Sequence, residues 1–147
     1  MTPVQPVFKT DLIKRRFEKM HPQAQELLLE MIAWANDNGI QAIVTETATT
    51  YAEDLKLKRM SSTHREGRAF DISTKGWSTV EIIAFQQFFE PRYGHLGATS
   101  HKTGAPRLIV HHDAGTGAHF HVQLNRQYAV HWEKEEENGE EKEARDE

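Results

Sequence analysis

The chain has no cysteine among its 147 residues, which excludes disulfide bridges, thiolate metal sites and cysteine nucleophiles. It has no run approaching the roughly 18 consecutive apolar residues of a membrane-spanning helix, so we expect no membrane insertion. Residues 1–6 lack the basic and apolar regions of a secretory signal, which predicts synthesis in the cytoplasm without a signal peptide. Length and composition fit one soluble domain.

Acidic side chains are concentrated at the C-terminus. Residues 133–147 hold nine acids, three bases and almost no apolar side chains, whereas the net charge of the whole chain is only −4. This composition predicts a single domain over residues 1–132 and a disordered acidic tail over 133–147. The body of the chain is therefore mildly basic but has no cationic stripe, so we expect no nucleic-acid partner. We also expect the protein to be a monomer.

Hydrophobic spacing predicts an α+β fold in which most helices precede most strands. Helical patterns occur in residues 12–20, 22–38, 51–60 and 78–90. The second helix has as its buried stripe Leu27, Leu28, Met31, Ile32 and Ala35. Ser78 and Glu81 have the spacing of a capping box. The helix that they open is expected to end before Pro91, and its apolar residues are Val80, Ile83, Ala84 and Phe88.

Strand patterns occur in residues 40–47, 68–73, 107–112 and 118–124. The last two are separated by Asp-Ala-Gly-Thr-Gly, and these turn residues favour an antiparallel hairpin. Histidine is unusually frequent in this half of the chain. Of nine histidines, six lie between residues 95 and 121, namely His95, His101, His111, His112, His119 and His121. Imidazole is the commonest metal ligand in proteins, so this clustering favours a metal site.

Two short segments carry the chemistry: Ser62-Thr63-His64-Arg65-Glu66-Gly67-Arg68-Ala69-Phe70-Asp71 and His119-Phe120-His121. Gly67 allows the chain to turn, so that His64 and Asp71 can approach one metal ion. His119 and His121 share a strand face because strand side chains alternate, so one can bind the metal while the other stands beside it. A catalytic zinc ion takes three such nitrogen or oxygen ligands and keeps one position open.

Each residue also has an ordinary structural interpretation. His64 by itself is typical of a surface loop, and Asp71 by itself is typical of a turn or a cap. A His-x-His strand also occurs as a plain polar face or as a site for another metal. The joint spacing, with a glycine and a small Ala69 between the first two ligands, favours the metal site over these readings.

The pattern Ser-x-His-x-x-Gly-x-Ala-x-Asp, followed about fifty residues later by His-x-His, resembles the LAS zinc peptidases. This group includes lysostaphin, D-alanyl-D-alanine peptidases and hedgehog proteins. The chain looks most similar to D-Ala-D-Ala carboxypeptidases and to phage L-alanyl-D-glutamate endolysins, over residues 22–124. The resemblance implies a small antiparallel sheet with helices on its outer face, and one Zn²⁺ bound by His64, Asp71 and His121. It also implies that Ser62 binds substrate.

The implied activity is hydrolysis of stem or cross-link peptides in bacterial peptidoglycan by a zinc-activated water, in a phage or prophage endolysin or in a cellular peptidase. Two positions depart from the family pattern. Ala118 stands where many relatives have a Glu or Asp base, so His119, or an acid from residues 111–113, is expected to replace it. Thr49-Thr50-Tyr51 stands where many relatives have an arginine, so Arg59 or Arg68 is expected to contact the substrate instead.

His119 has two possible roles that the sequence leaves open: proton transfer between water and the leaving amine, or stabilisation of the oxyanion. The alternative function is a zinc-containing, catalytically inactive module that binds cell wall or protein, as in the hedgehog branch. Loss of the usual acid at Ala118 favours this alternative. A structural protein of a virion or tail that retains the fold is a third interpretation.

Overall fold

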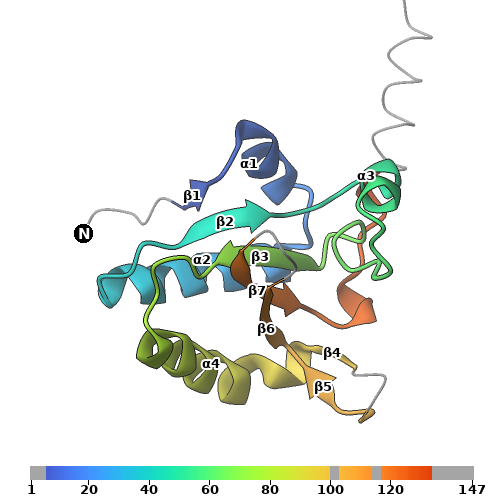
Figure 1. Cartoon of the computed structure of the whole chain (residues 1–147). Helices are drawn as coiled ribbons and strands as arrows, with labels where there is room; N and C mark the ends of the chain where they lie inside the picture. Colours follow the sequence, from blue (N-terminus) through green and yellow to red (C-terminus); the bar gives the residue numbers. More distant parts are fainter. Residues whose placement is uncertain (1–5, 100–102, 114–116, 134–147) are drawn as a thin grey trace, which may run out of the picture.

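The computed structural model describes residues 6–99, 103–113 and 117–133 and confirms the α+β class, with four α-helices in these ranges (Figure 1). The helices are α1 (Asp11–Phe17), α2 (Pro22–Asp37), α3 (Tyr51–Lys56) and α4 (Thr79–Tyr93), and 3₁₀ turns follow at Gly94–Leu96 and Arg126–Tyr128. None of the described helices is long and apolar enough to span a bilayer.

The main sheet has five strands in the order β1, β2, β3, β7, β6. These are β1 (Val7–Phe8), β2 (Ile43–Glu46), β3 (Ala69–Ser73), β7 (Ala118–Gln123) and β6 (Ile109–Asp113). The expected wholly antiparallel sheet needs one correction, because β1 runs parallel to β2 while the other neighbours are antiparallel. A two-residue strand has no alternation that a sequence pattern could reveal.

The predicted hairpin is confirmed, since β6 and β7 pair antiparallel, although its turn residues 114–116 lie outside the described residues. A second, small hairpin pairs β4 (Ala98–Thr99) with β5 (Pro106–Arg107). It lies beyond the end of α4 (Figure 1). Its last residue, Arg107, is separated from the start of β6 only by Leu108.

Helix α2 forms as its sequence predicts. Pro22 occupies the first turn, where its missing N–H has no helical partner to lose. The predicted stripe is buried, and Gly39 closes the helix at a positive φ of 70°. The amide of Ile40 then bonds to the carbonyl of Ala35, which completes a Schellman motif.

Helix α4 begins at the predicted capping box of Ser78 and Glu81, but the prediction that it ends before Pro91 is wrong. It continues to Tyr93, because only two residues follow the proline and the carboxylate of Glu90 accepts the amides of Leu108 and Ile109. These bonds tie the last turn to the neighbouring strand segment and offset the loss of one helical bond.

The apolar residues predicted for α4 are also only partly those that face the core. Phe85 and Phe89 are buried, whereas Val80 and Ile83 are exposed and Phe88 is half-buried against the core. The buried face of α4 is thus rotated about the helix axis relative to the predicted one, because the aromatic rings of Phe85 and Phe89 pack into the core. Phe85 stacks on Phe120 of β7 with ring centroids 4.3 Å apart.

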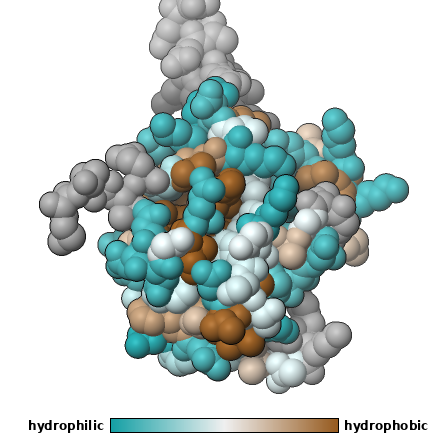
Figure 2. Space-filling model, turned by 60° about the vertical axis from the view of Figure 1, so that its left-hand side comes forward, coloured by the Kyte–Doolittle hydropathy of each residue, from teal (hydrophilic) through white to brown (hydrophobic). Residues whose placement is uncertain are grey.

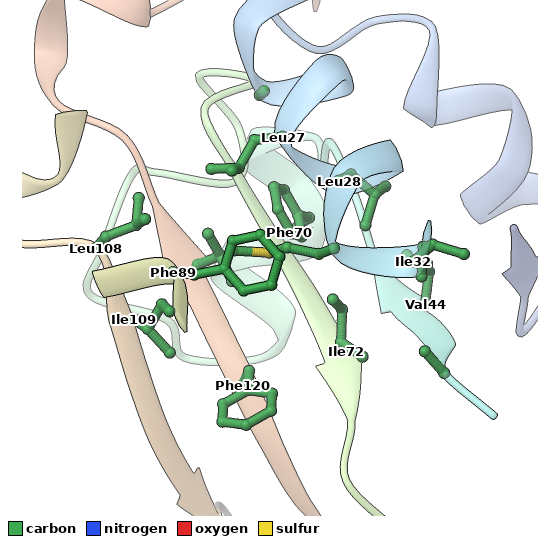
Figure 3. Close-up of a cluster of buried hydrophobic side chains, with 14 of the residues drawn as sticks. Leu27, Leu28, Ile32, Val44, Phe70, Ile72, Phe89, Leu108, Ile109 and Phe120 are labelled. Atoms are coloured by element: carbon green, nitrogen blue, oxygen red, sulfur yellow. The ribbon is translucent and has the colours of Figure 1, made fainter. Parts of the chain in front are cut away.

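The hydrophobic core fills one face of the sheet. Figure 3 shows side chains of α2 and Phe89 of α4 converging on this face, with the labelled residues Leu27, Leu28, Ile32, Val44, Phe70, Ile72, Phe89, Leu108, Ile109 and Phe120. Because strand side chains alternate, Phe70 and Ile72 on the core face leave Asp71 on the opposite face of β3. In the same way, Phe120 and Val122 direct His119 and His121 to that opposite face.

On the molecular face shown in Figure 2, hydrophobic residues occur in small patches separated by hydrophilic ones. Such scattered exposure is ordinary for a folded domain. Residues 134–147 of the predicted acidic tail lie outside the described residues. The first residue of that tail, Glu133, uses its carboxylate to accept the amide of Tyr51 at 3.0 Å.

Candidate metal centre

Strand pairing brings two of the three predicted ligands together. Strands β3 and β7 are neighbours, and their register places Asp71 directly opposite His121 and Ser73 opposite His119. Directly opposed residues of an antiparallel pair have side chains within contact distance on the same face. The polar face of the sheet therefore presents a carboxylate between imidazoles.

The third ligand, His64, lies on a helical turn that closes at Gly67. The amide of Glu66 bonds to the carbonyl of Ser62, the amide of Gly67 to that of His64, and the amide of Arg68 to that of Thr63. Gly67 has a φ of 64°, as the predicted turn requires, and an added Cβ would lie 3.2 Å from the carbonyl oxygen of Lys19. The turn returns the chain to β3, so that His64 faces Asp71.

The carbonyl groups at the end of this turn are bound by distant segments. The Arg65 carbonyl accepts the indole N–H of Trp132 at 3.0 Å, and the Glu66 carbonyl accepts the amide of Val130 at 2.6 Å. The Gly67 carbonyl accepts the amide of His21 at 2.8 Å. The position of His64 is thus fixed by α2 and by the C-terminal segment as well as by its own turn.

Two imidazole nitrogens converge on one carboxylate oxygen. Nε2 of His64 lies 3.2 Å from Oδ1 of Asp71, and Nδ1 of His121 lies 3.0 Å from the same oxygen. Ligand atoms of all three residues lie within 4.8 Å of one another, and they form a group that can hold a metal ion. His64 and Asp71 are buried, whereas His121 is half-buried. The group is therefore most covered at His64 and least covered at His121.

The remaining nitrogen of each imidazole also has an acceptor. Nδ1–H of His64 donates to the carbonyl of Thr47 at 2.9 Å. Nε2 of His121 lies 3.0 Å from Oε1 of Gln123 and 3.5 Å from the hydroxyl of Thr63. Metal-binding histidines in proteins are almost always held in this way through the nitrogen that does not bind the metal.

The charges within the group favour an ionised carboxylate. Burial raises the pKa of Asp71, but the neighbouring His64 and His121 outweigh burial and hold that pKa well below its ordinary value. Burial lowers the pKa of His64, and the charge and hydrogen bond of Asp71 outweigh this and raise it. A buried carboxylate in this state needs positive charge close by, which a protonated imidazole or a metal cation supplies.

The residues present fit a zinc ion. Two imidazoles and one carboxylate are a donor set of the kind found in catalytic zinc sites. Ligand atoms about 2.0–2.2 Å from a tetrahedral ion lie about 3.3–3.6 Å apart, a few tenths of an ångström more than the separations of 3.2 and 3.0 Å from Oδ1 of Asp71. His64, Asp71 and His121 would hold the ion.

His119 stands beside this group without joining it. Its Nε2 lies 3.7 Å from Oδ2 of Asp71, and its Nδ1–H donates to the carbonyl of Gly117 at 3.1 Å. His112 of β6 lies opposite His119, with ring centroids 4.4 Å apart. Burial lowers the pKa of His112, and the nearby His119 and His121 lower it further, which favours its neutral form. Nε2 of His119 lies on the polar face of the sheet, on the side of Asp71.

The structure places the predicted substrate residues at the edge of the site. Ser62 donates its hydroxyl to Glu66 at 3.1 Å, within the turn that carries His64. Arg59 forms ion pairs with Glu46 and Asp54 at 3.3 Å each, and its charge opposes part of the rise that Asp71 causes in the pKa of His64. Arg59 thus borders the group on the side of β2.

Arg68, the other candidate for substrate contact, is buried and has two structural partners. Its Nε donates to Glu66 at 2.8 Å, and its Nη1 donates to the carbonyl of Leu124 at 2.6 Å. These bonds connect the turn that carries His64 with the end of β7. Asp113, considered above as a replacement acid, accepts the amide of Gly117 at 3.2 Å.

Two residues at the site, Glu46 and Gln123, were not expected from the sequence, and His112 was expected only as a member of the histidine cluster. Glu46 lies opposite Asp71 in the register, because a bulge in β2 after Val44 shifts the pairing. His112 and Gln123 share the polar face with the ligands. Gln123 follows His121 by two residues, so strand alternation was a usable signal for it. The position of Glu46 depends on the bulge, which has no sequence signature here.

Comparison of the chain with models of protein families, with curated proteins and with solved structures gave no match. His64, Asp71 and His121 meet from separate segments in the predicted combination and form a group that can hold a metal ion.

Proposed function

We propose that the protein is a zinc metallopeptidase that hydrolyses peptide bonds in bacterial peptidoglycan. One observation carries the proposal: His64, Asp71 and His121 converge from a turn and two strands into a group that can hold one metal ion. The spacing of these ligands in the sequence is the one that resembles the LAS peptidases, which supports the substrate class. Both endolysin-like cleavage and carboxypeptidase cleavage remain within the proposal.

Bound zinc would polarise the scissile carbonyl and lower the pKa of water from about 15.7 towards 7. The side chains around the group would bind the substrate and transfer protons. With Nδ1 bound to the Gly117 carbonyl, Nε2 of His119 can accept a proton from the attacking water and return it to the leaving amine. Arg59 lies at the border with β2, where it can bind a carbonyl or carboxylate of the substrate.

A second function is favoured by one specific feature. Ala118, in the position of the acid found in many similar peptidases, has no group that can take a proton. If His119 does not replace that acid, the chain is a zinc-containing module that binds cell wall or protein without turnover. The two functions share the metal site and differ in product formation.

Mass spectrometry of purified peptidoglycan tests the proposal. The full chain is incubated with peptidoglycan in the presence of zinc, and separately with zinc removed by a chelator. We expect released muropeptides with a new amino or carboxyl terminus only in the zinc sample. Zinc binding without any product would support the binding module instead.

Single substitutions then test the ligands. His121→Ala and Asp71→Asn should both abolish stoichiometric zinc binding and product release, because each removes one of three ligands. His131→Ala is the matched control, since His131 is exposed and absent from the group. Full zinc occupancy in His121→Ala would refute the assignment of that ligand.

A further inference from the structure

The two imidazoles of the site face Asp71 with different ring nitrogens, and a neighbouring group must select the nitrogen in each case. Nε2 of His64 and Nδ1 of His121 face Asp71. A neutral imidazole has one N–H and one lone pair, so the atom that can bind a metal is the nitrogen without the proton. Whatever accepts a hydrogen bond from the other nitrogen decides which one that is.

For His64 the deciding group is part of the backbone. Its Nδ1 lies 2.9 Å from the carbonyl oxygen of Thr47, and a carbonyl can only accept a hydrogen bond. In the metal-bound form the single ring proton must therefore reside on Nδ1, which leaves the lone pair on Nε2 for the metal. His64 needs no additional side chain to select its metal-binding nitrogen.

For His121 the partner is the side-chain amide of Gln123, and the contacts of that amide show which of its atoms faces the ring. Gln123 lies 3.0 Å from Nε2, and an amide can either accept or donate. The other end of the amide settles the question, because Nε2 of Gln123 lies 3.3 Å from the carbonyl oxygen of Arg107. That carbonyl requires the NH₂ group, so the amide oxygen must face His121 and accept its Nε2–H.

The carbonyl of Arg107 is itself held in place. Arg107 pairs with Ala98 in the small hairpin, and the next amide, of Leu108, is bound by the carboxylate of Glu90. Gly97 lets a neighbouring segment pass close by, since a Cβ there would lie 2.5 Å from the carbonyl carbon of Arg107. The hairpin thus presents a rigid acceptor to Gln123.

We propose that Gln123 is a positioning residue. The Arg107 carbonyl fixes the orientation of its amide, and the amide oxygen then holds the proton on Nε2 of His121, so that Nδ1 is the metal-binding nitrogen. The proposal rests on the metal site of the proposed function. Thr63 is the competing partner, at 3.5 Å from the same Nε2. Its hydroxyl can donate or accept, and therefore cannot by itself fix the proton on Nε2.

Zinc affinity of the full chain, measured by competition with a chelator, is the first readout. Gln123→Met keeps the side-chain length without an acceptor and should weaken zinc binding by about 10- to 100-fold. Gln123→Glu retains an acceptor oxygen for Nε2 but loses the N–H that bonds to Arg107, so it should weaken binding less than Gln123→Met. Thr63→Val should have little effect, and Gln127→Met is the matched control on an exposed glutamine. Unchanged affinity in Gln123→Met, or equal weakening in Gln123→Glu, would overturn the proposal.

Nitrogen-15 spectra of the histidine rings in the zinc-saturated protein are the second readout. In the unmodified chain, His121 should bind the metal through Nδ1 and carry its proton on Nε2, whereas Gln123→Met should show a substantial share of rings with the two nitrogens exchanged. The same arrangement in Gln123→Met as in the unmodified chain would overturn the proposal. Absence of zinc from the unmodified protein would overturn the proposed function together with this one, whereas zinc bound equally by both chains would overturn only the role of Gln123.

Discussion

His119 is the titratable side chain that stands beside the candidate metal group with one ring nitrogen outside hydrogen-bond distance of its neighbours among the described residues. Its Nδ1 is occupied by the carbonyl of Gly117, while its Nε2 lies 3.7 Å from the nearer carboxylate oxygen of Asp71, beyond hydrogen-bond distance. A base must have a free lone pair near the reacting water, and this nitrogen has one. The side chain is still mostly covered, which keeps its orientation fixed.

His119→Ala should reduce kcat by about 10² to 10⁴, the usual contribution of positioned proton transfer, while zinc remains bound. His119→Gln can still donate a hydrogen bond to an oxyanion but cannot transfer a proton, so it should be equally slow. Steady-state kinetics on a soluble muropeptide, with zinc content measured in parallel, make the test. His111→Ala is the control, because His111 bonds to Thr74 on the opposite face of the hairpin. Near-native turnover in His119→Gln would assign the proton transfer elsewhere.

The candidate metal group was predictable from the sequence in part: spacing indicated His64, Asp71 and one of His119 and His121, and the resemblance to the LAS peptidases selected His121. Gly67 closes a turn, and His121 lies on an alternating strand, so both signals act over a few residues. Glu46 and Gln123 were not predictable to the same degree. Glu46 reaches Asp71 through a bulge, and the role of Gln123 depends on Arg107, which a separate hairpin brings into place. Such tertiary causes leave no pattern in the residues themselves.

The C-terminal end of helix α3 positions Arg59, a predicted substrate residue. The helix is shorter than the predicted residues 51–60, because Lys58 adopts a left-handed conformation with φ 55°. The amide of Arg59 then bonds to the carbonyl of Asp54 at 2.9 Å, which forms the same Schellman closure as in α2. The closure turns Arg59 back towards Asp54 and Glu46 at the border of the metal site.

Lys58→Gly should raise the free energy of unfolding by roughly 0.5 to 1 kcal/mol, because the strain of a Cβ at positive φ exceeds the added flexibility of glycine. The melting temperature should rise by a few degrees. Thermal unfolding of the metal-free protein measures the effect. Lys58→Ala removes the charge but keeps the Cβ, so it should show no such gain. An equal gain in Lys58→Ala would attribute the effect to the side chain.

The start of α3 predicts a dependence of stability on pH. Burial raises the pKa of Glu53, but hydrogen bonds from Arg16 and Thr50 outweigh it and lower that pKa below 4.5. Because the pKa is lower in the folded state, the stabilisation is complete above about pH 4.5 and is lost as pH falls through the folded value. Glu53→Gln keeps the capping box and removes only the charge.

Glu53→Gln should therefore lower the free energy of unfolding by roughly 0.2 to 1 kcal/mol at pH 7, a small value because the side chain is 38% exposed. The difference from the unmodified protein should shrink as the pH falls below 4.5. Urea unfolding of the metal-free protein at several pH values measures it. Glu26→Gln, on an exposed part of α2, controls for the change in net charge. A difference that persists at low pH would mean that the charge of Glu53 is not the cause.

At the scale of the whole molecule, the C-terminal segment holds the metal-binding turn against the body. Trp132 is buried, donates its indole N–H to the Arg65 carbonyl, and packs under the guanidinium of Arg16 at 5.0 Å. Glu133 continues this contact by accepting the amide of Tyr51. The predicted domain boundary after residue 132 thus runs through a segment that still contacts the fold.

Trp132→Phe should lower the free energy of unfolding by about 1 kcal/mol, since it removes one hydrogen bond and keeps a ring. Trp132→Ala should lower it by about 3 to 5 kcal/mol. Both should weaken zinc binding, because the turn that carries His64 loses support. Urea unfolding and chelator competition measure the two effects.

Trp77→Phe provides the control, as the indole nitrogen of Trp77 is buried with no hydrogen-bond partner among the described residues. It should leave zinc affinity unchanged. Loss of stability in Trp132→Phe with no change in zinc affinity would limit Trp132 to a role in stability.

The distant closure of the turn that carries His64 has a kinetic consequence. The indole of Trp132 follows its acceptor by 67 residues, and His121 follows Asp71 by 50, so the site forms only after long segments of chain have been brought together. A growing polypeptide would lack a competent site until nearly all of the described sequence has left the ribosome. Interactions formed after the rate-limiting step of folding mainly slow unfolding. Zinc should therefore lower the unfolding rate in stopped-flow experiments and leave the refolding rate almost unchanged.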